Sequence, residues 1–391
     1  MSKLTLLSPP QAPSPSDPAA LPHVLLVLDQ VSRTLGGGER IVLKLAALLP
    51  QYGFRVSVLT FFAHPSSPFL AAATCPVYEL PLTSTYDRNA FHAALELRRF
   101  LKAQSVQIVQ TFFESSDLWA GLVVKLTSPA RLIWSRRDMG ILRAPKHHLA
   151  YRLLANLPDH VLAVSELVRQ YSIDTDGIHP DRVTTIYNGL NLADWTTPTP
   201  PPAQPFHITT LGNIRHVKGH DVFLRAASLI VQRHPDTRFT IAGEILEPDY
   251  YAHLLELIQQ LNLTHHVHFL GGVTNLRNHL TTAHLFVLPS RSEGFSNAII
   301  EAMAASLPVV ATNVGGNAEA VQHGHSGLIV PPEDPHALAT AILRLLEDPA
   351  TRSRMGAAGR ELVLQKFTIH AMMTHTTQLY QKLLDLPNAT P

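Results

Sequence analysis

The chain has very little cysteine and no residue pattern typical of a structural zinc site. Cys75 is the one cysteine in 391 residues, so no internal disulfide can form. No set of four cysteine and histidine residues shows zinc-finger spacing. These absences favour a reducing compartment, and we therefore expect a cytoplasmic protein.

An excess of charge of either sign is also missing. Lysine and arginine number 31 against 30 acidic residues, which leaves a formal charge of +1. A near-neutral chain gives little support to nucleic acid as the main partner. Charged residues make up only 16% and apolar residues 46%, a composition typical of a globular protein with well-developed cores.

Long apolar runs are absent as well. No uninterrupted run approaches the roughly 18 residues of a membrane-spanning helix. The apolar stretch before Pro9 and Pro10 is too short for a signal peptide. We therefore expect neither secretion nor a membrane span.

The common nucleotide-binding motifs are missing. No Gly-x-x-x-x-Gly-Lys-Ser/Thr motif occurs, which excludes P-loop chemistry. Gly36-Gly37-Gly38-Glu39 follows the first predicted strand but lacks the spacing of a dinucleotide fingerprint. Its glycines would let backbone amides approach an anion at a helix start. A flexible turn is the alternative that this motif alone leaves open.

Proline is abundant, with 30 residues, and it is clustered. One cluster lies before residue 23 and another in residues 196–205, and such runs are stiff and solvated. The clusters predict five parts: a disordered leader (1–22), an N-terminal domain (23–195), a linker (196–205), a C-terminal domain (206–368) and a terminal segment (369–391).

Short apolar runs alternate with helical patterns in both halves. Predicted strands cover residues 23–28, 55–61, 108–111, 131–135 and 160–165, then 206–211, 237–242, 267–270, 285–289 and 308–312. Predicted helices include residues 39–49, 90–103, 219–233, 250–261, 297–305 and 337–347. Continuous apolar strands between helices indicate parallel sheets covered on both faces. We therefore predict an α/β protein with two Rossmann-like domains, whose ligand binds beyond the carboxyl ends of the strands in the cleft that they face.

Two motifs of the second half are suited to a phosphorylated, hydroxyl-rich ligand. Arg215 and Lys218 stand just before a predicted helix, where both can reach a phosphate, although a solvated basic turn is the alternative. Glu293 follows a strand and Glu301 lies eight residues further on, so both carboxylates could hold hydroxyls of one elongated ligand. Helix capping and a solvated helix face are the alternatives.

Several motifs, in this order, resemble the family 4 retaining glycosyltransferases. They are Val164-Ser165-Glu166-x-Val168-Arg169, Ile186-x-Asn188-Gly189-Leu190, Lys218-Gly219-His220-Asp221, the pair Glu293 and Glu301, Gly315-Gly316-x-x-Glu319, and Gly324-x-x-Gly327-Leu328-x-Val330-Pro331-Pro332-x-Asp334. The resemblance extends from about residue 23 to 384. It implies the GT-B fold, with the nucleotide sugar held mainly by the second domain and a terminal helix, residues 369–384, returning to the first.

The resemblance also implies roles for individual residues. Arg215 and Lys218 would bind the donor diphosphate, Glu301 the ribose hydroxyls, and Glu293 the transferred sugar. The resemblance further implies donor contacts at Gly37, Gly38, Gly271, Val273, Gly294, Phe295, Ser296 and Asn297. The donor would be linked to UDP or GDP. The resemblance implies that the departing phosphate can itself take the acceptor's proton, so no protein nucleophile is required. It implies no other cofactor and no metal.

One region departs from the family pattern. Many relatives carry a histidine after a central strand of the first domain, where this chain has Arg136, Arg137 and Asp138. We expect Arg136 and Arg137 to bind the acceptor and Asp138 to contact the sugar or acceptor. A surface cluster of arginine and aspartate is the alternative. Residues 131–152 are also basic and amphipathic, so peripheral contact with an anionic membrane and a solvated helix face both stay open.

The expected function is transfer of a hexose from a nucleotide sugar in glycan, exopolysaccharide or glycolipid assembly. A nucleotide-sugar epimerase of the same architecture and a non-catalytic sugar-nucleotide-binding protein are the alternatives. The joint presence of Arg215, Lys218, Glu293 and Glu301 favours the transferase. Base, sugar and acceptor stay open at this point.

Overall fold

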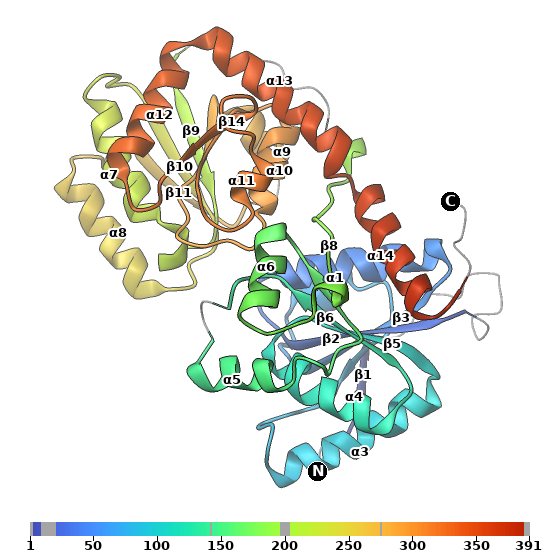
Figure 1. Cartoon of the computed structure of the whole chain (residues 1–391). Coiled ribbons are helices and arrows are strands. Elements are labelled where there is room, and N and C mark those ends of the chain that lie inside the picture. The colour runs from blue at the N-terminus through green and yellow to red at the C-terminus, as the bar shows by residue number, and fades with distance from the viewer. Residues whose placement is uncertain (1–2, 9–20, 141–142, 196–203, 274–275, 387–391) are drawn as a thin grey trace. The chain divides into compact units, whose positions relative to one another are not determined.

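The computed structural model describes the chain except for residues 1–2, 9–20, 141–142, 196–203, 274–275 and 387–391 (Figure 1). The chain divides into two compact units. The first unit comprises Met1–Tyr187 with Met372–Pro391, and the second comprises Asn188–Ala371. This division falls before the predicted linker, residues 196–205, of which 196–203 lie outside the described residues.

Within its described residues, the first unit is built on an eight-stranded sheet of order β1-β4-β3-β2-β5-β6-β7-β8. Neighbouring strands are parallel except for β1 and β4. The strands are β1 (Thr5–Ser8), β2 (His23–Val31), β3 (Arg55–Ala63), β4 (Val77–Glu79), β5 (Val106–Thr111), β6 (Arg131–Arg136), β7 (His160–Ala163) and β8 (Val183–Thr185). The central strand β2 is buried over its first six residues, because helices cover both faces of a parallel sheet.

Strand β1 lies within residues 1–22, which the sequence predicted to be a disordered leader. Thr5 and Leu6 pair in antiparallel register with Glu79 and Tyr78 of β4. The apolar residues of this short segment therefore complete an edge of the sheet. Residues 1–2 and 9–20 of the predicted leader lie outside the described residues.

The helices of the first unit are α1 (Gly37–Leu48), α2 (Pro68–Ala72), α3 (Arg88–Ala103), α4 (Gly121–Thr127), α5 (Pro145–Leu153), α6 (Glu166–Asp174) and most of α14 (Ile369–Leu383). Helix α14 begins in the second unit, and its residues from Met372 onward pack in the first. The Tyr380 ring is fully buried, meets Phe54 edge-on at 5.6 Å, and its hydroxyl contacts Gln110. A large aromatic residue thus anchors the helix.

The second unit has a parallel six-stranded sheet of order β11-β10-β9-β12-β13-β14 in its described residues. The strands are β9 (His207–Leu211), β10 (Arg238–Ala242), β11 (Val267–Gly271), β12 (Leu285–Leu288), β13 (Val309–Thr312) and β14 (Gly327–Val330). The helices are α7 (His220–Val231), α8 (Pro248–Gln260), α9 (Leu276–Thr281), α10 (Asn297–Ala304), α11 (Asn317–Ala320), α12 (Pro335–Glu347) and α13 (Pro349–Lys366).

Local sequence signals explain where several of these helices begin. Asp334 and Asp348 each precede a proline, and each carboxylate accepts a hydrogen bond from the amide three residues on, at 2.8 and 2.9 Å. Proline at the first helical position fits because its missing N–H has no intrahelical partner there. Helix α7 packs against α8 and α12, which closes the core on that side of the sheet.

Candidate donor and acceptor sites

The loops that follow β9, β12 and β13 carry most of the predicted donor residues. These strands are neighbours in the sheet, so their carboxyl ends lie side by side. The Arg291 amide donates to the Val217 carbonyl at 2.8 Å, which joins the first two loops. The Gly316 amide donates to the Gly294 carbonyl at 2.9 Å, which joins the second and third. Residues far apart in sequence thus form one continuous edge.

Lys218 and Glu293 meet at this edge, as an ion pair 2.6 Å long from Nζ to Oε1. Ser290 donates its hydroxyl proton to the same carboxylate oxygen at 2.7 Å. The side chains are 25% and 10% exposed, so the pair is largely screened from water but reachable. The structure therefore brings together two residues that the sequence assigned to the same ligand.

Arg215 is paired with a carboxylate that the sequence had not singled out. Its Nε lies 3.2 Å from Oε1 of Glu247, which immediately precedes α8. The other oxygen of Glu247 accepts from the His216 amide at 2.8 Å. These hydrogen bonds, chiefly the one from His216, lower the pKa of Glu247 and keep it ionised.

Glycine is required at two positions of this edge by close backbone approach. Gly219 has φ of +64°, and a Cβ there would lie 2.1 Å from the Pro289 carbonyl oxygen. Gly315 has φ of +51°, and a Cβ would lie 1.6 Å from the Glu293 carbonyl oxygen. Both residues bring neighbouring loops into contact where any side chain would push them apart.

Two of the side chains at the start of α10, those of Phe295 and Asn297, are occupied by contacts within the second unit. Phe295 is buried, and its ring packs against Phe367 with centroids 5.2 Å apart. Ser296 is the N-cap residue, but its side chain does not cap the helix. Asn297 Oδ1 accepts from Asn188 Nδ2 at 2.8 Å, so this predicted donor residue holds another part of the second unit. Glu301 is half-buried on α10, one turn into the helix.

Gly271 ends β11 and Val273 follows it, two strands away from β9. Gly271 has φ of +64°, and nothing lies within 4 Å of a Cβ built there. Residues 274–275 lie outside the described residues. The predicted contact of Gly271 and Val273 with the donor stays a prediction.

The glycine-rich start of α1 in the first unit already has a carboxylate partner. The Gly36 amide donates to Glu39 Oε2 at 2.5 Å. Burial raises the pKa of Glu39, although this hydrogen bond opposes the shift. A Cβ on Gly37 would meet nothing, whereas one on Gly38 would lie 2.7 Å from Cζ of Phe113. Donor contact by Gly37 and Gly38 stays a prediction.

Arg136 was predicted to bind the acceptor, but the structure buries its side chain. The last residue of β6, it is 4% exposed and forms ion pairs with Asp117 at 2.8 Å and Asp176 at 3.0 Å. Its guanidinium also lies 3.8 Å from the centroid of the Tyr151 ring. Burial raises the pKa of Asp117 to about 6, against the opposing effect of Arg136. Two buried carboxylates thus draw this arginine into the unit, and its side chain is structural.

Arg137 and Asp138 lie beyond the end of β6 and are more accessible. Asp138 is exposed, and its Oδ1 accepts from the Gly140 amide at 2.7 Å. Arg137 is half-buried, and burial lowers its pKa, although Asp138 counteracts the shift. The structure leaves both residues as acceptor-side predictions.

The basic stretch 131–152 is not one continuous charged face. Arg143, like Arg136, is 4% exposed and pairs with Asp176 at 2.8 Å. The exposed part lies on α5, where Leu149 and Leu153 are 60% and 75% exposed beside Lys146 and Arg152. Contact with an anionic membrane stays a prediction, now confined to α5. In the part of the chain that the structure describes, no helix has the length and apolar character to cross a bilayer.

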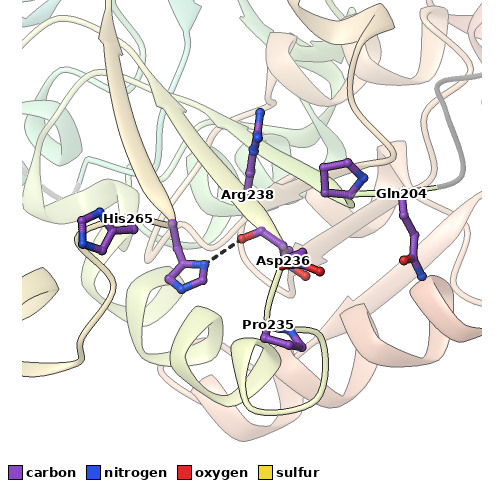
Figure 2. Close-up of a pocket in the computed structure, with 8 residues that line it drawn as sticks. Gln204, Pro235, Asp236, Arg238 and His265 are labelled. Carbon is purple, nitrogen blue, oxygen red and sulfur yellow. Dashed lines mark hydrogen bonds between the residues drawn. The ribbon is translucent and has the colours of Figure 1, made fainter.

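A pocket of about 520 Å³ in the second unit lies at the amino ends of the strands, opposite the carboxyl ends that carry the loops described above (Figure 2). Gln204, Asp236, Arg238 and His265 line it, at the amino ends of β9, β10 and β11. A hydrogen bond of 3.1 Å connects Nδ1 of His266 to the Thr237 carbonyl oxygen there. This pocket is therefore not the place where the sequence predicted the donor.

Three further residues, Asp221, Tyr250 and Arg291, connect the loops of this edge to α8, and the sequence analysis did not single them out as site residues. Arg291 forms an ion pair with Asp221 at 2.8 Å, and Tyr250 donates to Asp221 at 2.5 Å. Charged residues directly after a strand or at a helix start would have been the signal for Arg291, Asp221 and Glu247. Their pairing was not predictable, because Arg291 and Asp221 are 70 positions apart.

Two family models and several known proteins resemble this chain. Residues 35–194 match the family described as Glycosyltransferase Family 4, and residues 194–362 match Glycosyl transferases group 1. A D-inositol 3-phosphate glycosyltransferase of Arthrobacter sp. strain FB24 is 31% identical over 307 residues, which are 75% of this chain and 68% of that protein. The chain belongs to glycosyltransferase family 4.

Other relatives of this family 4 member match over a shorter region. Glycogen synthase of Mycobacterium tuberculosis is 32% identical over 201 residues, 51% of this chain and 48% of that protein. The chain thus spans about half the length of that relative. Among solved structures, the Anabaena protein HepE in complex with UDP gives a TM-score of 0.79 at 21% identity, covering 93% of this chain and all of HepE, 100%. This likeness confirms the predicted α/β fold class, GT-B with two Rossmann-like units.

Proposed function

We propose that this chain is a retaining glycosyltransferase that moves a hexose from a nucleoside diphosphate sugar to an acceptor hydroxyl. The observation that carries the proposal is the ion pair of Lys218 and Glu293 at the carboxyl edge of the second sheet, with Arg215 in the same loop. Lys218 supplies a cation that would bind phosphate, and Glu293 supplies a carboxylate that would bind sugar hydroxyls, and the two are in contact. Membership of family 4 supports this interpretation.

The relatives support a nucleotide sugar as donor. Structures of HepE contain UDP in one case and UDP-glucose in another. We extend this to a donor linked to UDP or GDP for the present chain. The glycogen synthase and the inositol phosphate glycosyltransferase among its relatives are named for transfer to different acceptors, so the acceptor is proposed only as a hydroxyl of a glycan or glycolipid.

Each side chain of the donor edge would act in a specific way. Arg215 would bind the diphosphate through its planar guanidinium and Lys218 as a compact point charge. When Lys218 turns from Glu293 to a phosphate oxygen, Glu293 is released to accept hydrogen bonds from sugar hydroxyls. Glu301 would hold the ribose, and the amides of residues 294–296, just before α10, would orient the sugar.

The chemistry would need no protein nucleophile. The bond between the anomeric carbon and the phosphate oxygen breaks, and the acceptor oxygen bonds to the same face of that carbon. The acceptor's proton passes to the departing phosphate oxygen. Arg215 and Lys218 would stabilise the negative charge that grows on the diphosphate, which is the part of the transition state that fixed cations favour most. A divalent metal is not required for this scheme.

Residues of the first unit would serve the acceptor. Asp138 is exposed beyond β6 and Arg137 adjoins it. Asp138 would accept a hydrogen bond from a sugar or acceptor hydroxyl. The products would enter glycan, exopolysaccharide or glycolipid assembly.

A donor screen tests the proposal. UDP- and GDP-linked hexoses are incubated with and without glycan and glycolipid acceptors, and release of the nucleoside diphosphate is measured. We expect release that depends on an acceptor. Epimerised donor without acceptor would indicate the epimerase, and donor binding without any turnover would indicate a binding protein.

Substitution then tests the residue roles. Lys218→Ala is expected to lower kcat/KM by about 10²- to 10³-fold, the size of effect seen when one fixed donor to a developing oxyanion is removed. Glu301→Ala should mainly raise KM for the donor. Lys366→Ala removes an exposed lysine at the end of α13 and should leave both constants unchanged. Wild-type turnover by Lys218→Ala would contradict the assignment.

A further inference from the structure

Arg291 joins three loops of the second unit through its side chain. The guanidinium donates to both oxygens of Asp221 at 2.8 Å each, and to the His216 carbonyl at 2.7 Å. It also contacts both carboxylate oxygens of Glu333, in the loop that precedes α12. These partners lie after β9, at the start of α7 and after β14, while Arg291 itself follows β12.

Every N–H of this guanidinium has an acceptor. Nε donates to Glu333, Nη1 to Asp221 and His216, and Nη2 to Asp221 and Glu333. Arginine has five such donors, so none is left for a substrate oxygen. The side chains of Arg291 and Asp221 are each 17% exposed. Arg291 therefore acts on other residues and does not bind the donor.

Asp221, which accepts two of these hydrogen bonds, is itself fixed from a second side. Tyr250 of α8 donates its hydroxyl proton to Asp221 at 2.5 Å and accepts from the Asp221 amide at 3.1 Å. Burial alone would raise the pKa of Asp221, but the hydrogen bonds from Arg291 and Tyr250 lower it well below its usual range. Both members of the ion pair thus stay charged across the physiological pH range.

The loop that Arg291 holds is the one that carries the two proposed phosphate-binding cations. Arg215 lies directly before His216, whose carbonyl Arg291 binds, and Lys218 directly follows Val217, whose carbonyl accepts from the Arg291 amide at 2.8 Å. The loop ends at Gly219, which adopts φ of +64°. Residues 216–218 form a single 3-10 turn, with local hydrogen bonds from the Lys218 amide to the Arg215 carbonyl at 2.9 Å and from the Gly219 amide to the His216 carbonyl at 3.2 Å. These bonds shape the turn, whereas contacts from outside it, such as those of Arg291, fix its place against the neighbouring loops.

We propose that Arg291 is a positioning residue, which holds Arg215 and Lys218 in the geometry that binds the donor diphosphate. The inference rests on the proposed function, because it presumes that these two cations bind a diphosphate. This positioning role needs a forked guanidinium. Lysine would keep the charge but could not bridge Asp221, Glu333 and the His216 carbonyl at once.

The test is Arg291→Lys, measured alone and in the Lys218→Ala background. With the nucleotide sugar that the wild-type chain turns over, we expect KM for the donor to rise and kcat to fall, each by about tenfold. Misplacement of a charged group weakens its contacts in the ground state and weakens those in the transition state still more. In the Lys218→Ala background the same substitution should change both constants by less than about threefold, because one of the two cations through which it acts is gone and only Arg215 is left to misplace. Arg233→Lys, at an ion pair with Glu347 that is 3.0 Å long, serves as control and should leave both constants unchanged.

The outcomes separate this inference from its foundation. Equal losses in both backgrounds would show a merely structural role and overturn the proposal, as would wild-type constants for Arg291→Lys. Absence of turnover by the wild-type chain with every donor would overturn the proposed function, and the inference with it. If Arg291→Lys does not fold, Tyr250→Phe removes one hydroxyl from the same network. It should give about a twofold loss that becomes smaller in the Lys218→Ala background.

Discussion

Both proposed phosphate-binding cations hold a carboxylate in the structure, but the two carboxylates differ in what they can do next. Glu293, released from Lys218, lies where sugar hydroxyls would need an acceptor. Glu247 pairs with Arg215 across 3.2 Å and has no such proposed use. It would compete with a diphosphate for the same guanidinium. One partner would assist the reaction, whereas the other opposes binding.

Glu247→Gln should therefore tighten binding of a nucleoside diphosphate. The substitution removes the negative charge but keeps an oxygen that can accept from the His216 amide, at present 2.8 Å from Oε2. The ion pair is 36% and 40% exposed, and such pairs contribute about 0.2–1 kcal/mol. We expect Kd for UDP or GDP to fall by up to about fivefold in isothermal titration calorimetry.

The matched control is Glu256→Gln, an exposed position on α8, the helix that Glu247 precedes. It changes the net charge equally without touching Arg215. An equal gain in both variants would attribute the effect to overall charge and contradict competition at Arg215.

At the scale of single residues, the sequence could place the candidate residues after their strands but could not give their contacts. Arg215, Lys218 and Glu293 were predictable because each follows a recognisable strand. That Lys218 contacts Glu293, 75 positions away, depends on which strands are neighbours in the sheet. The burial of Arg136 was missed for a similar reason, since its partners Asp117 and Asp176 come from separate segments.

At the scale of elements, the contact between the loops after β12 and β13 depends on one glycine. Gly315→Ala would place a Cβ 1.6 Å from the Glu293 carbonyl oxygen at φ of +51°. Gly324 has the similar φ of +79° but nothing within 4 Å of a Cβ, so Gly324→Ala carries only the conformational cost. That cost is about 1–2 kcal/mol.

We expect Gly324→Ala to lose about that amount in urea denaturation, and Gly315→Ala to lose at least about 3 kcal/mol, because the clash adds to the backbone strain. Donor affinity should fall only in Gly315→Ala, since its clash displaces Glu293. Equal losses of stability in the two variants would contradict this prediction, because they would show that moving the two loops apart costs no free energy.

Predictability at this scale follows from the length and pattern of each element. The buried apolar strands, such as β2 and β9, were located because five or more residues carry the signal. Strands β4 and β8 have only three residues each and are defined by pairing with their neighbours. Helix α13 was missed because it lacks an apolar stripe: Gly356 and Gly359 pack closely against Ser306 and Met303 instead.

At the scale of the whole molecule, buried neutral histidines make folding sensitive to acid. His23, His160 and His220 are at most 6% exposed, and burial lowers the pKa of each to about 4. In the unfolded chain a histidine has a pKa of about 6.5. The unfolded state therefore binds protons first, so stability is retained above about pH 6.5 and lost as pH falls towards about 4.

His160→Gln tests this sensitivity. Between about pH 6.5 and 4, each such histidine contributes up to about 1.4 kcal/mol of lost stability per pH unit. The variant should lose less stability than the wild type over this range, as followed by urea midpoints at several pH values. His336→Gln, at an exposed position, should keep the wild-type slope. An unchanged slope in His160→Gln would mean that His160 is protonated without unfolding.

Helix α14 also gives the molecule an unusual order of assembly during translation. The second unit ends at Ala371, whereas the first requires Met372 onward, including Tyr380, to complete its core. The unit that the ribosome begins first is therefore the last to be finished. Until Tyr380 leaves the exit tunnel, the nascent first unit exposes the apolar surface around Phe54. Chaperones would meet that half of the protein for longer, even though it is made earlier.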